Sequence, residues 1–354
     1  MILSAPARTR ATKRPSLRGR RRSRSGWAPW LILLGLLGCH GPATASTSCS
    51  ATMTDVAFGT VDPHGGNVDV QATINYSCTI TSILSSSRVR MCFSIGVGSS
   101  GLGHLTPRRM INGANAMAFQ LYKDAGRSLI WATRFNSEGS VGVDLEVGAL
   151  LGSATNSGSL TVYGRVPTGQ STLVPGSYSN TFGGAHTELV YQYNEFLLGL
   201  LGFPASCTSG GNGSGASTFP FVASAVVQKQ CSPMFATPSI DFGTQGLLRT
   251  PVATTTILSP RCTNTTPYQI GLDNGQHASG NTRRMQSATG DHVSYELYRD
   301  ASHSLRWGNT QNVDTVSGTG TGAAQDLTVH GRISEQTTPA AGSYSDTVTV
   351  TIYY

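Results

Sequence analysis

The chain has 354 residues, of which 12 % are charged, 8 % are aromatic and 42 are glycine. This composition excludes a coiled coil and a charged helical bundle, and the length suits two domains of about 100–200 residues each. The net charge of +7 does not indicate nucleic acid binding, because nine of the 25 Lys and Arg residues lie at or before Arg24.

Residues 1–45 are predicted to be a signal peptide. The basic segment is followed by the apolar run 27–38 and by Ala43-Thr44-Ala45, which is typical of a signal-peptidase site. Cleavage after Ala45 leaves 16 Lys and Arg against 18 Asp and Glu, so we expect an exported chain of nearly neutral charge. An alternative is cleavage before Cys39, because residues 36–39 resemble a lipoprotein signal that would leave Cys39 acylated.

The remaining chain contains one type of domain twice, over residues 46–228 and 229–354. Four blocks recur in the same order, which chance does not explain. They are Cys49…Phe58-Gly59…Cys78 and Cys231…Phe242-Gly243…Cys262; Arg108-Arg109-Met110 and Arg283-Arg284-Met285; Phe119-Gln-Leu-Tyr-Lys-Asp124…Trp131 and Tyr295-Glu-Leu-Tyr-Arg-Asp300…Trp307; and Leu160-Thr-Val-Tyr-Gly-Arg165 and Leu327-Thr-Val-His-Gly-Arg332.

Six cysteines remain after cleavage, an even number that indicates disulfides in an exported protein. Cys49 and Cys78 occupy the same places in the first copy as Cys231 and Cys262 in the second, so we expect these two pairs. Cys92 and Cys207 have no counterparts in the second copy and are expected to form a third bridge. None of the cysteines forms a C-x-x-C motif, and no cofactor or metal is predicted.

Three apolar segments of the first copy lack the alternation of a strand and are predicted to be loops. Large exposed apolar patches usually mark interaction sites. An inward-folded cap is the alternative for the longest segment, and the sequence leaves both open. The residues concerned are Ile83, Leu84, Leu150, Leu151, Phe196, Leu197, Leu198, Leu200, Leu201 and Phe203.

The first copy continues past its last matching strand into the segment 218–228. Apolar residues alternate there as on the inward face of a buried strand. We expect this segment to complete the first domain from within the chain, as an internal donor strand. Its inward residues are predicted to be Phe219, Phe221, Ala223, Ala225 and Val227.

The second copy ends on a predicted strand, residues 344–354, with no later segment to cover its edge. Proteins avoid leaving a strand edge unpaired, and pilus subunits solve this by accepting a strand from a neighbour. We expect Val348, Val350, Ile352 and Tyr354 to line or flank the acceptor groove. After cleavage only residues 46–48 precede Cys49, so the chain is expected to accept a donor strand without providing one. Such a subunit would end a fibre.

The fold class predicted from these patterns is all-β, with two tandem immunoglobulin-like sandwiches and the C-terminal one lacking its last strand. The repeated blocks resemble the spore coat protein U domain, over residues 49–196 and 231–354. The first copy departs from that pattern at Ala132 and Asn180, where the second copy has Gly308 and Asp346. Proteins of this family form secreted fibres and the subunits of archaic chaperone–usher pili.

The resemblance implies an adhesin in the first domain and a pilin in the second, with attachment to abiotic or host surfaces and biofilm formation. It also implies a periplasmic chaperone, an outer-membrane usher and the next pilin subunit as partners, and a route through the periplasm to the cell surface. The runner-up is a structural spore-coat or matrix protein that polymerises without adhering. No enzymatic role is predicted.

A polar, sugar-binding tip is the competing interpretation, with Trp131, Asn136 and Glu138 as its best candidates. Trp131 recurs as Trp307 in the second copy, which favours a structural role. The same argument assigns structural roles to Arg108, Arg109, Asp124 and Arg165.

Overall fold

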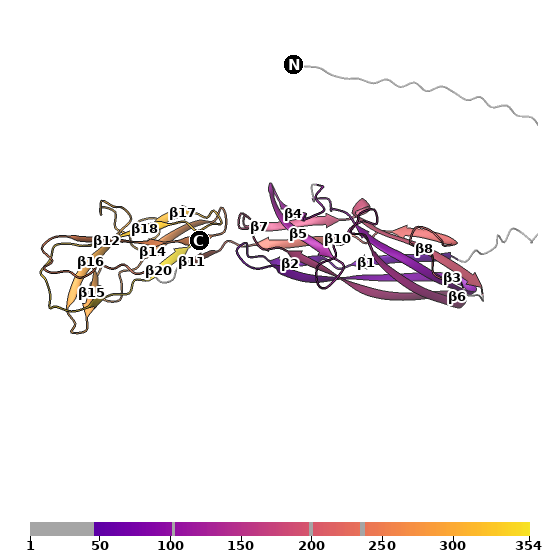
Figure 1. Cartoon of the computed structure of the whole chain (residues 1–354), viewed down its shortest axis with the longest axis horizontal. Helices are drawn as coiled ribbons and strands as arrows, with labels where there is room; N and C mark the ends of the chain where they lie inside the picture. Colours follow the sequence, from indigo (N-terminus) through magenta and orange to yellow (C-terminus); the bar gives the residue numbers. More distant parts are fainter. Residues whose placement is uncertain (1–45, 101–102, 198–200, 234–237) are drawn as a thin grey trace, which may run out of the picture. The chain divides into compact units, whose positions relative to one another are not determined.

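The computed structural model describes residues 46–100, 103–197, 201–233 and 238–354, and the predicted signal peptide, with Cys39, lies outside them. The regular secondary structure of the described chain is almost entirely β-strand, arranged in two separate sandwiches (Figure 1). Within it, no helix is long and apolar enough to cross a membrane.

The first sandwich contains ten strands and one short 3-10 helix. Its strands follow the sheet order β2-β10-β7-β4-β5-β6-β3-β8-β9, with β1 paired to β3. The elements are β1 (Ser46–Met53), β2 (Val56–Thr60), β3 (Val68–Ile95), β4 (Arg108–Asn112), β5 (Asn115–Tyr122), β6 (Val141–Val166), β7 (Gly176–Phe182), η1 (Gly184–His186), β8 (Thr187–Leu197), β9 (Gly213–Ser217) and β10 (Phe221–Val227).

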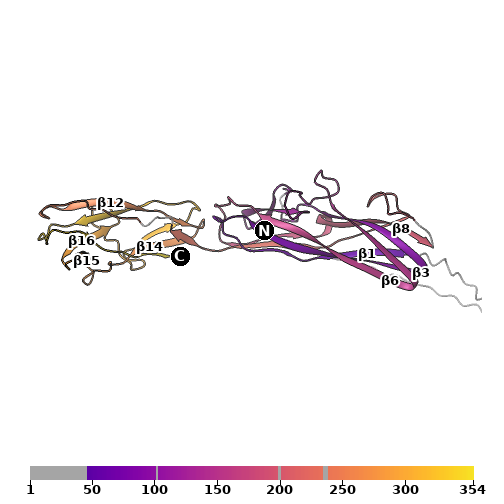
Figure 2. The same cartoon turned by 60° about the horizontal axis from the view of Figure 1, so that its bottom comes forward.

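The long strands β3 and β6 form one antiparallel ribbon that folds back on itself. Ile83 pairs with Leu151 near its midpoint. The Cys78 and Met91 sulfurs, on the two halves of β3, lie 3.7 Å apart, whereas a straight strand would separate them by about 40 Å. Leu84 and Gly152 have positive φ angles of 62° and 94°, which turn the ribbon without ending the ladder. The midpoints of β3 and β6 and the last residues of β8 therefore lie at one end of this sandwich (Figure 2).

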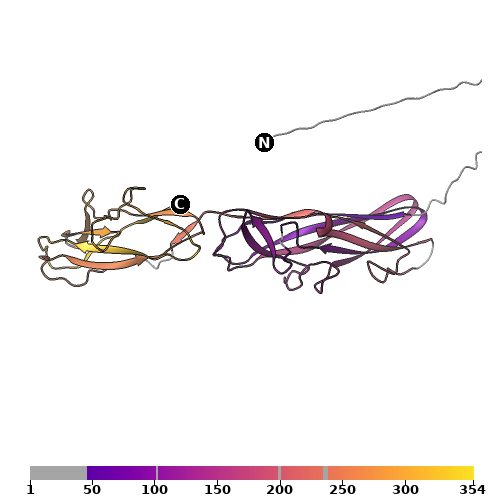
Figure 3. The same ribbon diagram turned by 90° about the horizontal axis from the view of Figure 1, so that it is seen from above.

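The second sandwich has a five-stranded sheet, β12-β18-β16-β15-β19, a three-stranded sheet, β17-β14-β20, and the pair β11-β13. Its strands are β11 (Cys231–Pro233), β12 (Val252–Leu258), β13 (Pro260–Cys262), β14 (Pro267–Leu272), β15 (Arg283–Ser287), β16 (His292–Tyr298), β17 (Val316–Thr319), β18 (Leu327–Ile333), β19 (Tyr344–Ser345) and β20 (Val350–Tyr353). None of them is longer than 7 residues, whereas β3 and β6 have 28 and 26 residues, and Figure 3 shows such long strands in the first sandwich alone.

The repeated residues form the same buried cluster in each sandwich. The Trp131 indole donates to the Phe93 carbonyl at 2.8 Å, and Trp307 donates to the Ile270 carbonyl at the same distance. The Arg108 guanidinium donates to the Trp131 carbonyl at 2.7 Å. Arg283 donates likewise to the Trp307 carbonyl at 2.9 Å.

Both arginines of this cluster are fully buried. Burial lowers the pKa of Arg108 to about 9, because the protein replaces the water around the charge with backbone carbonyls. Trp131 is also fully buried, so a sugar-binding role for it is wrong. The buried position of Trp131 and its hydrogen bond to the Phe93 carbonyl explain why both copies have a tryptophan here.

The C-terminal segment is not the single strand that we predicted. It forms β19 in one sheet and β20 in the other, and residues 346–349 between them belong to no strand. In the corresponding part of the first sandwich, β7 and β8, each strand has partners on both sides. Apolar and polar residues do alternate along this segment, but its two ends pair in different sheets, so it forms two strands instead of one.

Candidate functional site

The segment predicted to be an internal donor forms β10, which lies between β7 and β2. It runs antiparallel to β7, with Phe221 opposite Phe182 and Val227 opposite Gly176, and parallel to β2. The Asp55 carboxylate accepts a hydrogen bond of 2.8 Å from the Val222 amide, which secures the start of the strand. Strand β10 is thus paired along both edges.

The inward side chains of this segment fill the centre of the first core. Phe221 stacks on Phe182 with ring centroids 4.5 Å apart, and Phe219 lies parallel to Trp131 at 6.1 Å. All five predicted inward residues, Phe219, Phe221, Ala223, Ala225 and Val227, are buried. Fully burying a large apolar side chain stabilises a fold by about 1.5–3 kcal/mol.

The same stretch of chain also supplies β9, which pairs with the outer edge of β8. Tyr193 is opposite Gly213, and Leu189 is opposite Ser217. Residues 213–227 therefore cover β8 and then β7 in succession. In the described part of the second sandwich, nothing corresponds to β9 or β10, and β19 and β20 each have a partner on one side only.

Apolar side chains next to β19 and β20 in the second sandwich are less buried than their counterparts in the first. Tyr178 and Phe182 are fully buried, whereas their counterparts Tyr344 and Val348 are half-buried. We call residues 344–353, together with Ile240 and Phe242, the uncovered edge.

The residues that would lie across from β19 and β20 differ in burial between the two sandwiches in the same way. Val56 and Phe58 of β2 are buried against β10, whereas the matching Ile240 and Phe242 are half-buried and lie outside any strand. Val348 lies at the uncovered edge, Val350 and Ile352 pair with β14, and Tyr354 is exposed. The open backbone and the half-covered apolar residues thus coincide.

Asp346 fixes the stretch between β19 and β20 to neighbouring residues of the same sandwich. Its Oδ1 accepts hydrogen bonds of 2.9 and 3.2 Å from the Gln276 and His277 amides, and its Oδ2 accepts one of 2.9 Å from the Tyr295 hydroxyl. Burial, helped by that carboxylate, raises the pKa of the Tyr295 phenol far above its ordinary value. In the first sandwich, Asn180 holds backbone groups at the same position.

Leucine side chains gather where the ribbon of β3 and β6 folds back. Leu150 and Leu151 are 78 % and 81 % exposed, and Leu84 and Leu197 are also largely exposed. The ladder brings them together, because Ser85 pairs with both Ala149 and Leu197. We call these four leucines the apolar end.

The predictions that residues 83–84 and 147–152 are loops are wrong. Both segments belong to the strands β3 and β6, because their ladder continues through the fold-back. Phe196 and Leu197 likewise belong to β8. The Ile83 side chain and residues Leu198 and Leu200 lie outside the described residues.

The chain after β8 returns along the outer surface of β3. Arg88 donates to the Leu201 carbonyl at 2.7 Å, and its guanidinium lies 5.7 Å from the ring centroids of Phe196 and Phe203. Sequence reasoning missed the contacts of Arg88 with these two aromatic rings, because they depend on the strand register, which also places Arg88 opposite Glu146. Arg88 thus binds the described part of this segment to the sheet. Leu201 and Phe203 remain partly exposed.

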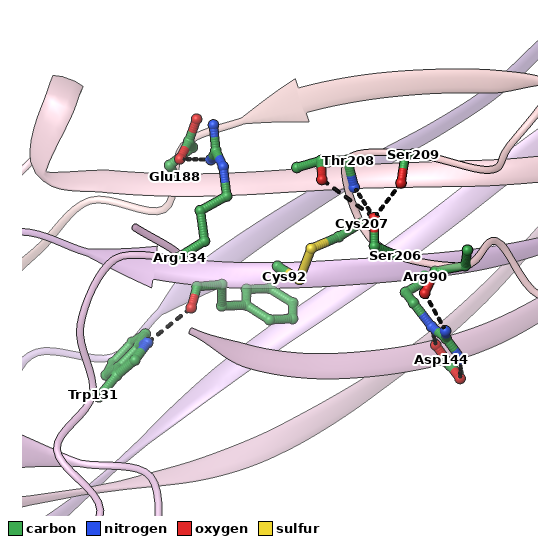
Figure 4. The surroundings of a disulfide bond; sticks show 12 residues. Arg90, Cys92, Trp131, Arg134, Asp144, Glu188, Ser206, Cys207, Thr208 and Ser209 are labelled. Atoms are coloured by element: carbon green, nitrogen blue, oxygen red, sulfur yellow. Dashed lines mark hydrogen bonds and ion pairs between the residues drawn. A yellow bond between two sulfur atoms is a disulfide. The ribbon is translucent and has the colours of Figure 1, made fainter. Parts of the chain in front are cut away.

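The disulfides join the pairs Cys49–Cys78, Cys92–Cys207 and Cys231–Cys262. Figure 4 shows the second bridge below the segment 206–209, with Arg90 and Asp144 paired beside it. This bridge anchors the returning chain to β3. No group of three or more potential metal ligands occurs within the described ranges.

The chain is thus a protein of two tandem immunoglobulin-like β-sandwiches, the first with β10 of its own chain in its core and the second with an uncovered edge. The profile of the Spore Coat Protein U domain matches residues 37–184 and 217–351. The chain belongs to the Spore Coat Protein U domain family, in two copies.

Two known proteins show how far this likeness extends. Protein U of Myxococcus xanthus is 34 % identical over 104 residues, and the match spans 27 % of this chain and 58 % of that protein. The CsuC–CsuE chaperone–tip adhesion subunit pre-assembly complex, from archaic chaperone–usher Csu pili of Acinetobacter baumannii, contains a chain of the same fold. That chain is 19 % identical, with a TM-score of 0.50, over 87 % of this chain and all of the other.

Proposed function

We propose that this chain is an exported fimbrial subunit at the tip of an archaic chaperone–usher pilus. The observation that carries the proposal is the contrast between the two sandwiches: residues 213–227 cover β7 and β8, and nothing described covers β19 and β20. A donor strand from another protein would pair with the uncovered edge as β9 and β10 pair in the first sandwich. That donor is first a periplasmic chaperone and then the next pilin subunit, delivered through an outer-membrane usher.

The strand pairing of the first sandwich supports the proposed position at the tip. Its place for a donor strand is already occupied by β10, so no other subunit can add a strand there. Residues 46–48, just before Cys49, are themselves paired with β3, and Thr47 donates a hydrogen bond of 2.6 Å to Glu195. These residues are therefore engaged within the domain rather than extended toward a neighbour.

The apolar end supports an adhesive role for the first domain. Four exposed leucines at the fold-back of one ribbon form an apolar surface without a partner in the described chain. Contact with an abiotic or greasy host surface would remove these side chains from water, at about 25 cal/mol per Å² of apolar area. Attachment through this end would support biofilm formation.

Hydrogen exchange of the full oxidised chain tests the assembly role. The amides of residues 346–348 are expected to exchange much faster than those of residues 177–181, which pair with β10, whereas the Thr349 amide is held by the Asp273 carboxylate at 2.8 Å. A peptide copying residues 218–228 should then slow the exchange at 346–353, and the same peptide with aspartate at the positions of Phe221 and Ala223 should not. Equal protection of both segments without any peptide would refute the proposal.

A polymerising spore-coat or matrix protein is the second candidate, favoured by the description of the matching family, the Spore Coat Protein U domain. The two candidates differ at the apolar end. Leu151→Ser is expected to lower adsorption to a hydrophobic surface without changing donor-peptide binding if the chain is an adhesin. If the end is instead a contact between subunits, the same change should impair polymerisation.

A further inference from the structure

The outer face of the sheet formed by β1, β3 and β6 carries hydroxyl groups in registered rows. Strand pairing places one residue of each strand in each row, and all twelve side chains are exposed or half-buried. Eleven are hydroxyls and one is an amide, and none is charged. The rows are Ser46/Thr81/Ser153, Ser48/Thr79/Thr155, Ser50/Ser77/Ser157 and Thr52/Asn75/Ser159.

The face is hollowed between its last two rows. A shallow depression of about 410 Å³ lies there, within the range of about 300–1,000 Å³ that small-molecule sites occupy. Its polar lining consists of the six side chains of those two rows, and Ala51, Tyr76 and Gly158 between the rows complete it. The hollow is thus open and shallow, and none of the side chains that line it is charged.

Most of these polar groups have unused hydrogen-bonding capacity. Ser50 and Ser77 lie 3.3 Å apart and bond to each other. None of the described residues hydrogen-bonds the side chains of Thr52, Asn75, Ser157 or Ser159. A hydroxyl both donates and accepts, and so does an amide. The groups repeat about every 4.8 Å across the strands and about every 6.7 Å along them.

We propose that this face binds a neutral polysaccharide, with sugar units seated in the hollow. An array of uncharged donors and acceptors matches the hydroxyls of such a polymer. It offers no charge to attract a nucleic acid or an anionic polymer. The proposal is independent of the adhesive role of the apolar end, because the two surfaces share no residue.

Co-sedimentation of the full oxidised chain with cellulose, chitin, insoluble starch and cross-linked dextran tests the proposal. The wild type is expected to bind at least one of them, in competition with soluble oligosaccharides of the same sugar. Ser157→Arg, which fills the hollow, should weaken that binding about tenfold, the loss expected from one or two polar contacts. Ser157→Val, which keeps a strand-favouring side chain and removes the hydroxyl, should weaken it less.

Thr255→Arg is the matched control, because Thr255 is an exposed strand residue of β12 in the other sandwich. It should leave binding unchanged, and thermal unfolding should show that every variant folds. Binding to none of the four polymers, unchanged binding by Ser157→Arg, or preference for anionic alginate would each overturn the proposal. Loss of binding in Leu151→Ser but not in Ser157→Arg would assign adsorption to the apolar end. Self-association that Ser157→Arg abolishes would assign the face to a second copy of the chain.

Discussion

Truncating Phe221 to alanine tests whether β10 is part of the first core or only an edge added to it. The ring is almost fully buried, stacks on Phe182 at 4.5 Å and lies parallel to Trp131 at 6.5 Å. A buried Phe→Ala change costs about 3–5 kcal/mol, which includes the cavity that it leaves and the lost aromatic contact. For a domain of this size, about 2–4 °C per kcal/mol predicts a fall in melting temperature of about 6–20 °C.

The assay is calorimetry of the full oxidised chain, in which the first sandwich is expected to give a transition of its own. Val226→Ala on the same strand is the control, because Val226 is 40 % exposed and faces outward. Its effect should stay within about 1 kcal/mol, since surface substitutions usually cost little. If Phe221→Ala costs no more than Val226→Ala, then β10 does not contribute to the core, and the account of an internal donor strand fails.

Gly164→Ala should destabilise the first sandwich by about 1–3 kcal/mol, because an added Cβ would meet Phe58 and two valines at 3.0–3.1 Å. Gly331→Ala, its counterpart, should cost less in the same unfolding assay, since the half-buried side chains beside it have room to move. Replacing the Cys92–Cys207 disulfide by serines should lower stability by about 2–5 kcal/mol and speed proteolysis of residues 201–206. Asp69→Asn should lower the unfolding midpoint at neutral pH, because the hydrogen bond from Arg165 holds the pKa of that carboxyl below its ordinary value of 3.8. This difference should persist above pH 3.8 and vanish as the pH falls through the lower folded-state pKa.

The sequence predicted the parts of the fold that depend on local alternation and on the repeat. Strand β10 could be predicted because five apolar residues at period two fix both the strand and its inward face. The buried tryptophans could be assigned to structure because each copy has one. The disulfide partners Cys49 and Cys78 follow from the repeat and lie opposite each other in the ladder of β1 and β3.

The apolar end could not be predicted correctly from the same signals. The fold-back of β3 depends on a positive φ angle at Leu84, and a leucine in the sequence does not indicate such an angle. It also depends on pairing with a strand some seventy residues away. Gly152 has the conformational freedom for this turn, but glycines are too frequent in this chain to single it out. The sequence therefore predicts loops around these leucines, whereas the ladder of β3 and β6 continues through them.

The two ways of completing a sandwich differ in how stability depends on concentration. A donor strand within the chain, as in the first sandwich, is always present, so that domain should unfold at the same temperature at every protein concentration. A donor from another molecule stabilises only by mass action, by about 2.7 kcal/mol when its concentration is 100 times its dissociation constant. The proposed function thus requires the second sandwich to be the less stable one until a partner binds. The half-buried Ile240, Phe242 and Val348 provide the apolar contacts from which that partner would draw its affinity.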